Sequence, residues 1–481
     1  MSARAFDRRS SMRDPLTHVD AVFDRFARGS DAPGLVWGVI AGGDVHIRAL
    51  GVQDVASGAP VDSATVFRVA SLSKTFTALA VLKLRDDGRV LLDAPAERYV
   101  PELAALEYPR ADGPRVTVRA LLSHTAGFGG DDAWADRQLA LQDEALTRLV
   151  AQVPLRRVPE IAFEYSNFGY ALLGRLVGNA AGCPFAEYVE RELLRPLGMN
   201  ASCFDLARAP ESRRSIGYRR DHGRWSEEPA QGTGAFAAMG GLATSAADYA
   251  RFVAWLLAAW PPRNEADDPI LRRASRREIA RAQTFAPADD APSRTRGAGY
   301  GLGAEVYADE VLGEYFAHAG GVPGYGADVL LLPQRGLGVF AFANLTYGVP
   351  RRVTYAAASA LVTSGAYPVH CVHMGRAFAP IAAEVARIYE TGDVLTARGL
   401  LAANLLLDRA APQRNAQIAA IKRRLGACRG VASIRAEGAL AAVVTLDCRH
   451  GPLEAMIALA PPATPALALL DFRERESSRV D

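Results

Sequence analysis

The chain has 481 residues, of which 49% are hydrophobic and 22% are charged, and its formal net charge is +2. A single hydrophobic core stops growing near ~250–300 residues, so this length predicts two domains of an ordinary soluble protein. The interspersed charges exclude a one-sided field for nucleic acid, and no stretch approaches the ~18 uninterrupted apolar residues of a membrane span.

The N-terminal half begins with charged residues and then becomes β-rich. Residues 1–28 lack the run of roughly 7–15 apolar residues that a signal peptide needs, which favours a cytoplasmic protein. Two β-rich runs at 35–40 and 45–50, separated by a Gly-rich turn, predict an antiparallel hairpin. Apolar residues then recur at three- and four-residue spacing over 71–86, so we expect a helix that starts at Ser71.

After the first hairpin, strands are expected again only near the end of the first domain. Residues 116–260 mix helical segments with Gly- and Pro-containing loops, which indicates a mostly helical subdomain. Strands are expected at 314–318, 327–332 and 338–343, followed by a helix at 351–363. Strands at both sequence ends with helices between them predict an α/β (α+β) domain in which early and late strands share one sheet.

Two further stretches lack regular patterns. Residues 284–298, which contain several Pro, Asp and Gly residues, are expected to form a mobile surface loop. A break near 364–368 separates a first domain, 1–366, from a small α+β domain, 375–475. The helices and strands expected in the second domain are, in order, 377–389, 394–406, 414–425, 432–435, 441–446, 453–459 and 467–472.

The five cysteines show no Cys-x-x-Cys spacing. His370 and His373 flank Cys371, but no second ligand group accompanies them, so we expect no metal site and no cofactor. The cysteines are expected to be buried, reduced thiols. Cys428 and Cys448 bracket an expected strand, and they are the pair to test for a disulfide if the protein were exported.

Residues 71–74 are Ser-Leu-Ser-Lys, and Lys74 is one of only three lysines, since the other 52 of the 55 basic residues are arginines. Residues three apart share one helix face, so the Lys74 amine can lie beside the Ser71 hydroxyl. A desolvated lysine can lose its proton and activate a hydroxyl, which a guanidinium cannot do. The alternative is an ordinary N-cap serine beside a solvated lysine.

Two further motifs follow Lys74 in the sequence, at 165–167 and at 318–320. Residues 66–77 closely resemble the serine β-lactamase and penicillin-binding protein superfamily, in its class C-like branch. Tyr165 and Asn167 are spaced as in that family's Tyr-x-Asn motif, and His318 and Gly320 as in the His-x-Gly form of its third motif. Three motifs in the family's order indicate membership far better than any one of them.

The resemblance runs from about residue 20 to 363 and leaves the second domain uncovered. It implies a β-lactamase-like antiparallel sheet flanked by helices, with a helical subdomain. It also implies that Ser71 attacks a carbonyl to form an acyl-enzyme, and that Lys74 or Tyr165 takes the proton. The division of the base role between these two residues stays open.

Four residues are implied to bind the substrate: Asn167, His318, Gly320 and Gly321. Asn167 would contact the substrate amide or the Lys74 ammonium. The oxyanion hole would be the backbone N–H groups of Ser71 and Gly321. His318 stands where β-lactamases have a lysine, and an imidazole is a weaker fixed cation for a substrate carboxylate.

Three other polar residues are interpreted as structural. His124 invites a Ser-His-Asp reading, but the resemblance makes it a helix-end residue. Asp248 is expected to cap a helix or form an ion pair. Ser73 is two positions from Ser71 and therefore lies on another helical face.

The resulting hypothesis is a metal-independent serine hydrolase that acts on small esters, amides or D-amino-acid-type peptides. The alternatives are a β-lactamase and a non-catalytic sensor or scaffold that binds an acyl ligand. The expected partner is a small-molecule substrate, with no nucleic acid and no membrane. The oligomeric state and the role of the second domain stay open.

Overall fold

The computed structural model describes residues 8–287, 294–370, 378–461 and 466–474. By its contacts the chain divides into two compact units, Met1–Pro368 and Val369–Asp481. Each unit has its own sheet and its own hydrophobic core.

The first unit is built around an eight-stranded antiparallel sheet with the order β2-β1-β12-β11-β10-β9-β8-β7. Its strands are β1 (Gly34–Ala41), β2 (Asp44–Gly51), β7 (Thr284–Phe285), β8 (Thr295–Tyr300), β9 (Glu305–Asp309), β10 (Gly313–Val322), β11 (Tyr325–Leu332) and β12 (Leu337–Ala343). The earliest strand, β1, pairs with the last, β12, which confirms the expected closure of early on late strands.

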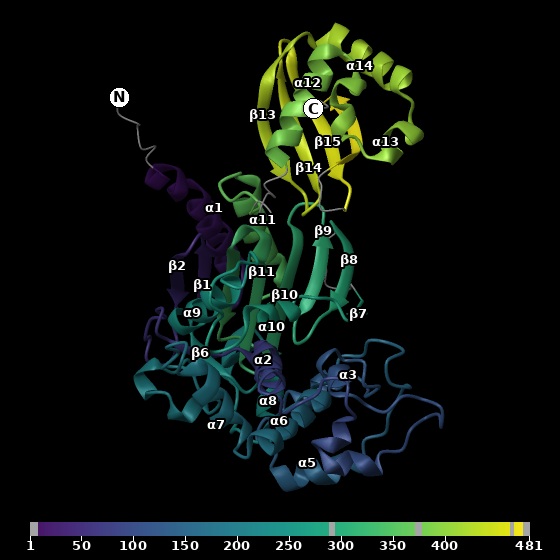
Figure 1. Ribbon diagram of the computed structural model, residues 1–481. Coiled ribbons are helices and arrows are strands. Elements are labelled where there is room, and N and C mark those ends of the chain that lie inside the picture. The colour runs from purple at the N-terminus through teal and green to yellow at the C-terminus, as the bar shows by residue number, and fades with distance from the viewer. Residues whose placement is uncertain (1–7, 288–293, 371–377, 462–465, 475–481) are drawn as a thin grey trace. The chain divides into compact units, whose positions relative to one another are not determined.

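Helices cover both faces of this sheet (Figure 1). Every residue of β1 is buried, and alternate residues enter different cores, because successive side chains of a strand point to opposite faces. Val36 and Ile40 pack in the core shared with α2 (Ser73–Asp86) and α9 (Ala246–Leu257). Trp37 packs in the core shared with α1 (Arg8–Gly29) and α11 (Arg351–Thr363).

The helix α1 was not predicted. Val19 and Phe23 are fully buried on its inner face, and the Phe23 ring stacks on Trp37 at 5.1 Å between centroids. Leu16 and Phe26 continue this stripe at helical spacing and pack partly buried against the same core, but many charged residues separate them in the sequence. The stripe nevertheless closes one face of the sheet.

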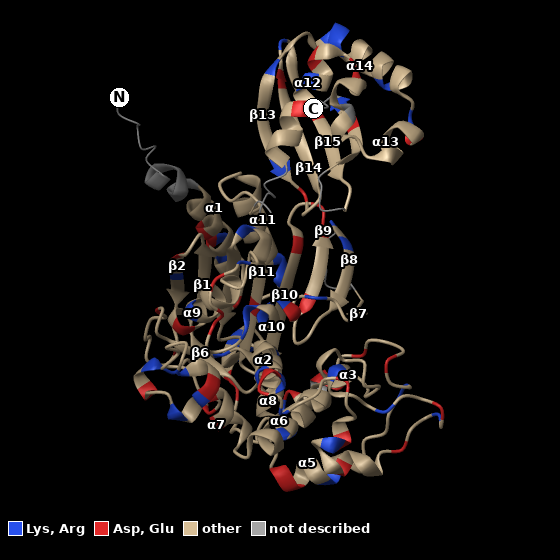
Figure 2. Ribbon diagram, viewed as in Figure 1, with Lys and Arg blue, Asp and Glu red and all other residues tan. Residues whose placement is uncertain are grey.

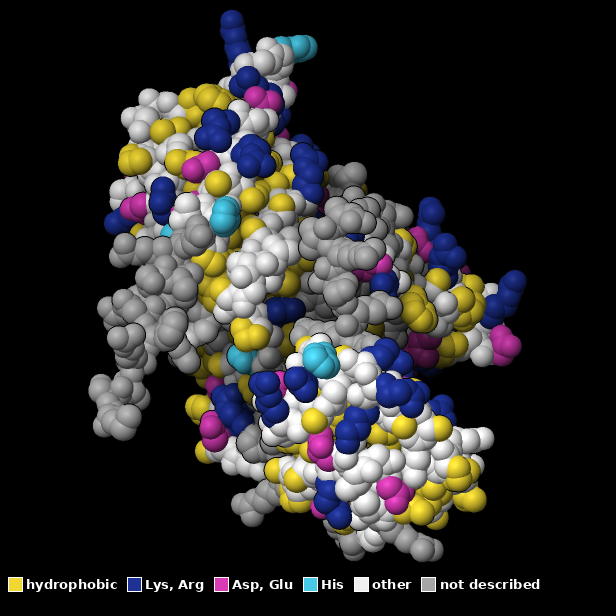
Figure 3. Space-filling view, turned by 90° about the horizontal axis from the view of Figure 1, so that it is seen from above, with side chains coloured by type: hydrophobic (Ala, Val, Ile, Leu, Met, Phe, Trp, Pro, Cys, Tyr) yellow, Lys and Arg dark blue, Asp and Glu magenta, His cyan; other side chains and the backbone are white. Residues whose placement is uncertain are grey.

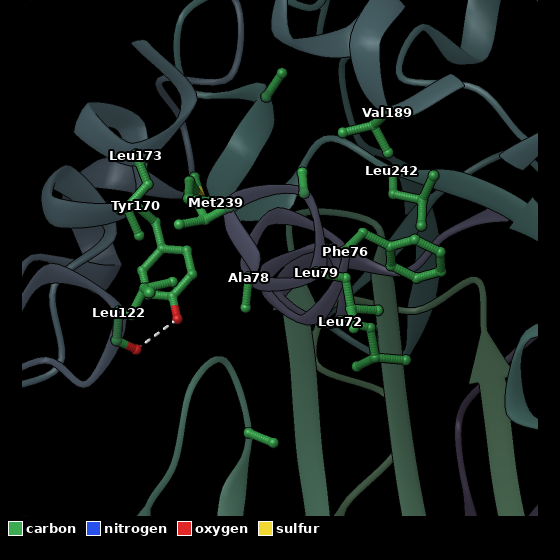
Figure 4. Packing of buried hydrophobic residues seen from close by; sticks show 14 of the residues in the cluster. Leu72, Phe76, Ala78, Leu79, Leu122, Tyr170, Leu173, Val189, Met239 and Leu242 are labelled. Carbon is green, nitrogen blue, oxygen red and sulfur yellow. Dashed lines mark hydrogen bonds between the residues drawn. The ribbon is translucent and has the colours of Figure 1, made fainter. Parts of the chain in front are cut away.

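The helix α2 is buried along nearly its whole length, and Figure 4 shows its residues Phe76, Ala78 and Leu79 among other buried hydrophobic side chains. Its Phe76 ring stacks on Phe252 of α9 at 4.1 Å. The buried residues of α2 lie on all sides and include polar ones such as Lys74 and Thr77, so α2 is surrounded by other elements of the unit. A short 3₁₀ turn, Ala70–Leu72, precedes it, so Ser71 lies just before the α-helix.

The region between β2 and β7 is mostly helical, as expected. Besides α2, its α-helices are α3 (Val118–Leu122), α4 (Asp132–Ala135), α5 (Asp143–Val150), α6 (Asn167–Ala181), α7 (Phe185–Val189), α8 (Ala237–Gly240), α9 and α10 (Arg273–Glu278). Two small ribbons pair β3 (Val66–Arg68) with β6 (Ala243–Ser245) and β4 (Tyr218–Asp221) with β5 (Arg224–Glu227). The β3–β6 ribbon leads directly into the Ser71 turn.

The second unit is a four-stranded antiparallel sheet with helices packed on it. Its elements are α12 (Phe378–Thr391), a 3₁₀ segment (Val394–Leu400), α13 (Ala403–Asp408), α14 (Ala411–Leu425), β13 (Cys428–Ala436), β14 (Ala441–Cys448), β15 (Gly451–Leu459) and β16 (Leu467–Glu474). The single helix expected over 394–406 is wrong, because Ala402 is extended and Leu401 bridges to Leu467 of β16.

The expected loop at 284–298 is also partly wrong. Its first residues form the edge strand β7, which pairs with β8 in the register Thr284 to Tyr300 and Phe285 to Gly299, and β8 pairs on its other side with β9. Residues 288–293 lie outside the described residues. Short strands of this kind have too few residues to establish a periodic pattern.

Cys428 and Cys448 lie directly opposite each other in the β13–β14 register, and both are free thiols. Cys371 is the cysteine flanked by His370 and His373. Both Cys371 and His373 lie outside the described residues. Within the ranges given above, no group of three or more metal-ligating side chains converges on a point.

Charged residues of both signs are distributed along the helices and strands (Figure 2). On the face seen in Figure 3, Lys and Arg side chains stand among acidic, hydrophobic and uncharged ones. No helix in the described part of the chain is long and apolar enough to cross a membrane.

One buried amide ties the sheet to the loops beneath it. The Asn344 side chain, at the end of β12, accepts a hydrogen bond from the Gly34 N–H at 2.7 Å. It donates to the carbonyls of Val52, Gln53 and Ile216 at 3.2, 3.3 and 3.1 Å. These contacts join segments that are up to 310 residues apart in the sequence.

We expect Asn344→Ala to lower the free energy of unfolding of the first unit by about 2–3 kcal/mol, because it leaves a buried N–H group and buried carbonyls unpaired. All five tryptophans precede residue 261, so tryptophan fluorescence during urea unfolding of the full chain reports on the first unit alone.

Asn179→Ala is the matched control. Asn179 is exposed and makes one hydrogen bond, to the Tyr99 carbonyl at 2.8 Å, so its loss should cost under about 0.5 kcal/mol. Equal effects of the two substitutions would contradict the role assigned to Asn344.

Candidate active site

The Ser71 turn is held in a strained backbone conformation. Ala70 has φ 49°, in the left-handed region that residues other than glycine rarely adopt. The Val69 N–H donates to the Leu242 carbonyl at 3.0 Å, and the buried Ser73 hydroxyl donates to the Ala70 carbonyl at 2.6 Å. Such strain costs of order 1–3 kcal/mol and persists where the surroundings fix it, commonly beside a reacting group.

The Lys74 amine is completely buried and has three hydrogen-bond acceptors. Its Nζ donates to Ser71 Oγ at 3.0 Å, to Asn167 Oδ1 at 2.6 Å and to the Met239 carbonyl at 2.7 Å. Burial lowers the pKa of Lys74 to about 8, although the carboxylates of Asp132, Asp136 and Asp131 oppose that shift. The expected pairing of Ser71 with Lys74 is therefore present in the structure.

The Tyr165 ring lies beside the same amine, with Lys74 Nζ 4.9 Å from its centroid. Burial raises the pKa of the Tyr165 hydroxyl well above its usual value of 10, and Asp132 adds to this. A hydrogen bond with Ser71 acts in the opposite direction but does not reverse the shift. This direction disfavours a resting phenolate and favours Lys74 as the base.

Asn167 is oriented by two aspartates at the start of α6. The Asp131 carboxylate accepts hydrogen bonds from the N–H groups of Asn167 and Phe168 at 2.7 and 2.8 Å, which fixes the first turn of the helix. Asn167 Nδ2 donates to Asp132 Oδ1 at 2.6 Å, so the amide oxygen is directed at Lys74. Of the two contacts expected for Asn167, the structure contains the one to the lysine.

His124 supports this arrangement from behind. Its Nδ1 accepts a hydrogen bond from the Ser166 N–H at 3.0 Å, and its ring packs on Tyr165 at 4.2 Å between centroids. Burial lowers the pKa of His124 well below its usual value, so the ring is neutral. The structural interpretation of His124 agrees with these contacts.

The other two residues interpreted as structural are also engaged away from Ser71. Asp248 accepts hydrogen bonds from the Ala201 N–H and the Ser202 hydroxyl at 2.8 and 2.9 Å, and pairs with Arg251 at 2.7 Å. Ser73 accepts a hydrogen bond from the Leu242 N–H at 3.0 Å in addition to its bond to Ala70. Both expectations are confirmed.

His318 is buried near the end of β10 as a neutral imidazole. Its Nδ1 lies 2.7 Å from the Ala319 carbonyl, which can only accept, so Nδ1 holds the proton and Nε2 accepts from the Tyr300 hydroxyl at 3.1 Å. Burial lowers the pKa of His318 to about 4, and the Lys74 charge contributes to this, while Glu305 opposes it. His318 therefore provides no fixed cation.

Gly320 and Gly321 allow β10 to approach the Ser71 turn. Pairing of β10 with β9 ends at Ala317 opposite Glu305, so the strand edge beyond it is not covered by β9. A Cβ atom on Gly320 would lie 2.4 Å from the Val69 carbonyl oxygen and 3.3 Å from Ser71 N. The strand and the turn therefore approach so closely that no side chain fits between them at this position.

A cleft of about 560 Å³ opens beside these residues. It is lined by Ser71, Asp132, Asp136, Tyr165, Glu305, His318, Ala319, Gly320, Gly321, Tyr347 and Val349. A second lobe of about 640 Å³ shares five of these residues and is also lined by Phe163, Ala286, Pro287, Ala298, Gly299, Tyr307, Pro350, Arg351 and Arg352. The two lobes together form the candidate site.

The structure brings all seven predicted site residues to this cleft or to its floor. They are Ser71, Lys74, Tyr165, Asn167, His318, Gly320 and Gly321. The sequence did not single out Asp131, Asp132, Asp136 or Tyr347, which lie in or next to irregular segments where no periodic pattern marks them.

Two carboxylates that line the first lobe have pKa values shifted in opposite directions. Burial raises the pKa of Asp136 to about 6, although a hydrogen bond from Tyr347 lowers it. Glu305 pairs with Arg351, which holds the pKa of that carboxyl below its usual value despite its burial. Among the groups that line the first lobe or lie directly beneath it, Lys74 is the one cation, and its amine can lose a proton.

Sequence comparison relates the chain to several known proteins. Esterase EstB of Burkholderia gladioli is 38% identical over 212 residues, which cover 40% of this chain and 52% of EstB. Protein flp of Staphylococcus aureus (strain N315) is 29% identical over 210 residues, which cover 43% of this chain and 41% of flp. The matches thus span about half or less of these relatives' own lengths.

Structural comparison extends the likeness past the first unit. The octameric penicillin-binding protein homologue from Pyrococcus abyssi matches with a TM-score of 0.63 over 95% of each chain, at 20% sequence identity. A structural match at this sequence identity shows that the two proteins share a fold, and no more than that. The beta-lactamase family model matches residues 19–363, close to the span expected from the motifs, and so the chain belongs to the beta-lactamase family.

Proposed function

We propose that this protein is a serine hydrolase that forms an acyl-enzyme at Ser71. The observation behind this proposal is the set of three acceptors around Lys74 Nζ. Two of them, the Asn167 amide oxygen and the Met239 carbonyl, can only accept. The third, the Ser71 hydroxyl, can also donate.

This asymmetry fixes what happens when Lys74 loses a proton. A neutral amine keeps two N–H groups, which stay with the two oxygens that cannot donate, and its lone pair then faces Ser71 Oγ. The Ser71 hydroxyl donates to that lone pair and becomes the nucleophile. As Ser71 attacks, its proton moves to Lys74, and from there it passes to the leaving group, directly or through the Tyr165 hydroxyl.

Backbone N–H groups of Ser71 and Gly321 are proposed to bind the oxygen of the tetrahedral intermediate. The close approach of β10 to the turn, measured at Gly320, supports this assignment. Water then attacks the acyl-enzyme, with Lys74 again taking a proton. Every step uses groups of the chain, substrate and water.

Charge favours neutral substrates. His318 is neutral, and Asp132, Asp136 and Glu305 line the first lobe, so a carboxylate such as that of a penicillin meets no fixed cation there. We therefore propose small esters and amides, including D-amino-acid-type peptides, ahead of β-lactams. The similarity to EstB, which is named an esterase, supports esters as substrates in this proposal.

The first prediction concerns covalent labelling. A fluorophosphonate and p-nitrophenyl acetate should each add one acyl or phosphonyl group to the full-length protein, detected by intact mass, and Ser71→Ala should abolish the addition. Ser57→Ala, which removes an exposed hydroxyl elsewhere, should leave labelling unchanged. A protein that is never labelled by these reagents or by a D-aminoacyl anilide would be the non-catalytic sensor or scaffold instead.

The pH dependence identifies the base. Because Lys74 must be neutral to accept the proton and its pKa is about 8, the acylation rate should rise about tenfold per pH unit below pH 8 and level off above it. Lys74→Arg keeps the charge but cannot release the proton, so it should lose about 10²- to 10⁴-fold in rate.

Single-turnover acylation between pH 6 and 10.5 measures this profile. A rate that keeps rising past pH 10 would assign the base role to Tyr165, whose pKa is raised. Near wild-type activity in Lys74→Arg would remove any catalytic meaning from the lysine.

Gly320→Ala tests the proposed oxyanion hole. The added Cβ would lie 2.4 Å from the Val69 carbonyl oxygen, so β10 must move away from the Ser71 turn. We expect kcat on p-nitrophenyl acetate to fall about 10²-fold, as when an oxyanion donor is lost. Gly297→Ala in β8, where the added Cβ meets nothing within 4 Å, should retain wild-type activity. Unchanged kcat in folded Gly320→Ala would contradict the assignment.

A further inference from the structure

Tyr347 occupies an unusual position in the turn between β12 and α11. Its φ is 54°, a left-handed conformation that is costly for a bulky residue. The turn is fixed by hydrogen bonds, since the Tyr347 N–H donates to the Tyr325 carbonyl at 3.1 Å and Thr346 Oγ1 accepts from the Gly324 N–H at 2.8 Å. The direction in which the Tyr347 side chain leaves the backbone is therefore set by the fold.

The Tyr347 side chain crosses from the sheet to the helical subdomain. Its ring lies against Gly321, where an added Cβ would be only 2.0 Å from Tyr347 Cδ1. Its hydroxyl donates to Asp136 Oδ2 at 2.6 Å, and Asp136, just after α4, is only 5% exposed. A buried carboxylate thus anchors the far end of the phenol.

Packing of the core does not account for this tyrosine. Tyr347 is 57% exposed, so most of its ring faces the cleft or solvent. A side chain this exposed contributes little hydrophobic stabilisation to set against its backbone strain. Strain retained at an exposed residue beside the proposed nucleophile suggests a role toward the substrate.

The acyl group and the leaving group of a substrate would lie in different lobes of the cleft. The leaving group must take a proton from Lys74 or Tyr165, and Tyr165 lines both lobes. Ser71, Asp136 and Tyr347 line only the first lobe. A substrate whose leaving group extends past Tyr165 into the second lobe therefore directs its acyl group toward Tyr347.

We propose that Tyr347, anchored by Asp136, is a specificity-determining residue that limits the size of the acyl group transferred to Ser71. The proposal rests on the serine hydrolase function proposed above. It assigns to this site esters and amides of small acyl groups, with the larger part of the substrate on the leaving-group side. The phenol ring is the barrier, and the hydrogen bond to Asp136 holds it in place.

The test compares p-nitrophenyl acetate with p-nitrophenyl octanoate, which share one leaving group. Wild-type protein should prefer the acetate in kcat/KM. Tyr347→Gly removes the ring and relieves the positive φ, so the octanoate-to-acetate ratio of kcat/KM should rise about tenfold or more. Tyr347→Phe keeps the ring but loses the hydrogen bond to Asp136, so its ratio should rise less than that of the glycine variant.

Controls separate this proposal from folding and from the proposed function. Tyr347→Asn, which also tolerates positive φ, serves as a second ring-free variant if the glycine variant unfolds on thermal melting. Phe285→Ala removes a 90% exposed aromatic that lines neither lobe and should leave the ratio unchanged.

Two outcomes overturn the proposal, and they are distinguishable. If folded ring-free variants hydrolyse the acetate with a wild-type ratio, Tyr347 does not limit acyl size, and the hydrolase function stands. If wild-type protein forms no Ser71 acyl-enzyme with either ester, as seen by intact mass, the proposed function fails and this inference fails with it.

Discussion

The buried amine of Lys74 is the group on which the geometry of the cleft depends. Its three acceptors come from three elements: Ser71 from the 3₁₀ turn, Asn167 from the start of α6, and the Met239 carbonyl from α8. A buried polar group left unpaired costs about 1–3 kcal/mol, so the three elements are held together around this one nitrogen. The same contacts that satisfy the amine thereby position the hydroxyl it is proposed to activate.

Much of the fold follows from the sequence, and the failures share a physical cause. The strands β1, β2, β11 and β12 and the helices α2 and α11 have strong apolar patterns and clear turn residues, and they form close to where they were expected. The prediction failed for α1, whose apolar residues are separated by many charged ones, and for β7 and β8, of which β7 has only two residues and lies at the edge of the sheet. In these places tertiary contacts decide the structure, and single-chain periodicity does not contain them.

The candidate site shows a similar division. Spacing alone brought Ser71 and Lys74 together, whereas Tyr165 and His318 required the family resemblance. Asp136 and its neighbours were missed because a carboxylate in a loop has no pattern of its own. Its importance comes from burial near a cation, which only the folded chain creates.

Those unpredicted carboxylates complete the account of Lys74. Burial lowers the amine's pKa, and Asp131, Asp132 and Asp136 oppose that shift, leaving it near about 8 against an ordinary 10.5. At pH 7, removing the proton is therefore much less costly than removing it from an ordinary lysine. The amine is thus protonated at rest, when it satisfies three acceptors, yet it can become a base at small cost. Two of these carboxylates, Asp132 and Asp136, also line the first lobe, so the proton affinity of Lys74 and the charge of that lobe depend on the same residues.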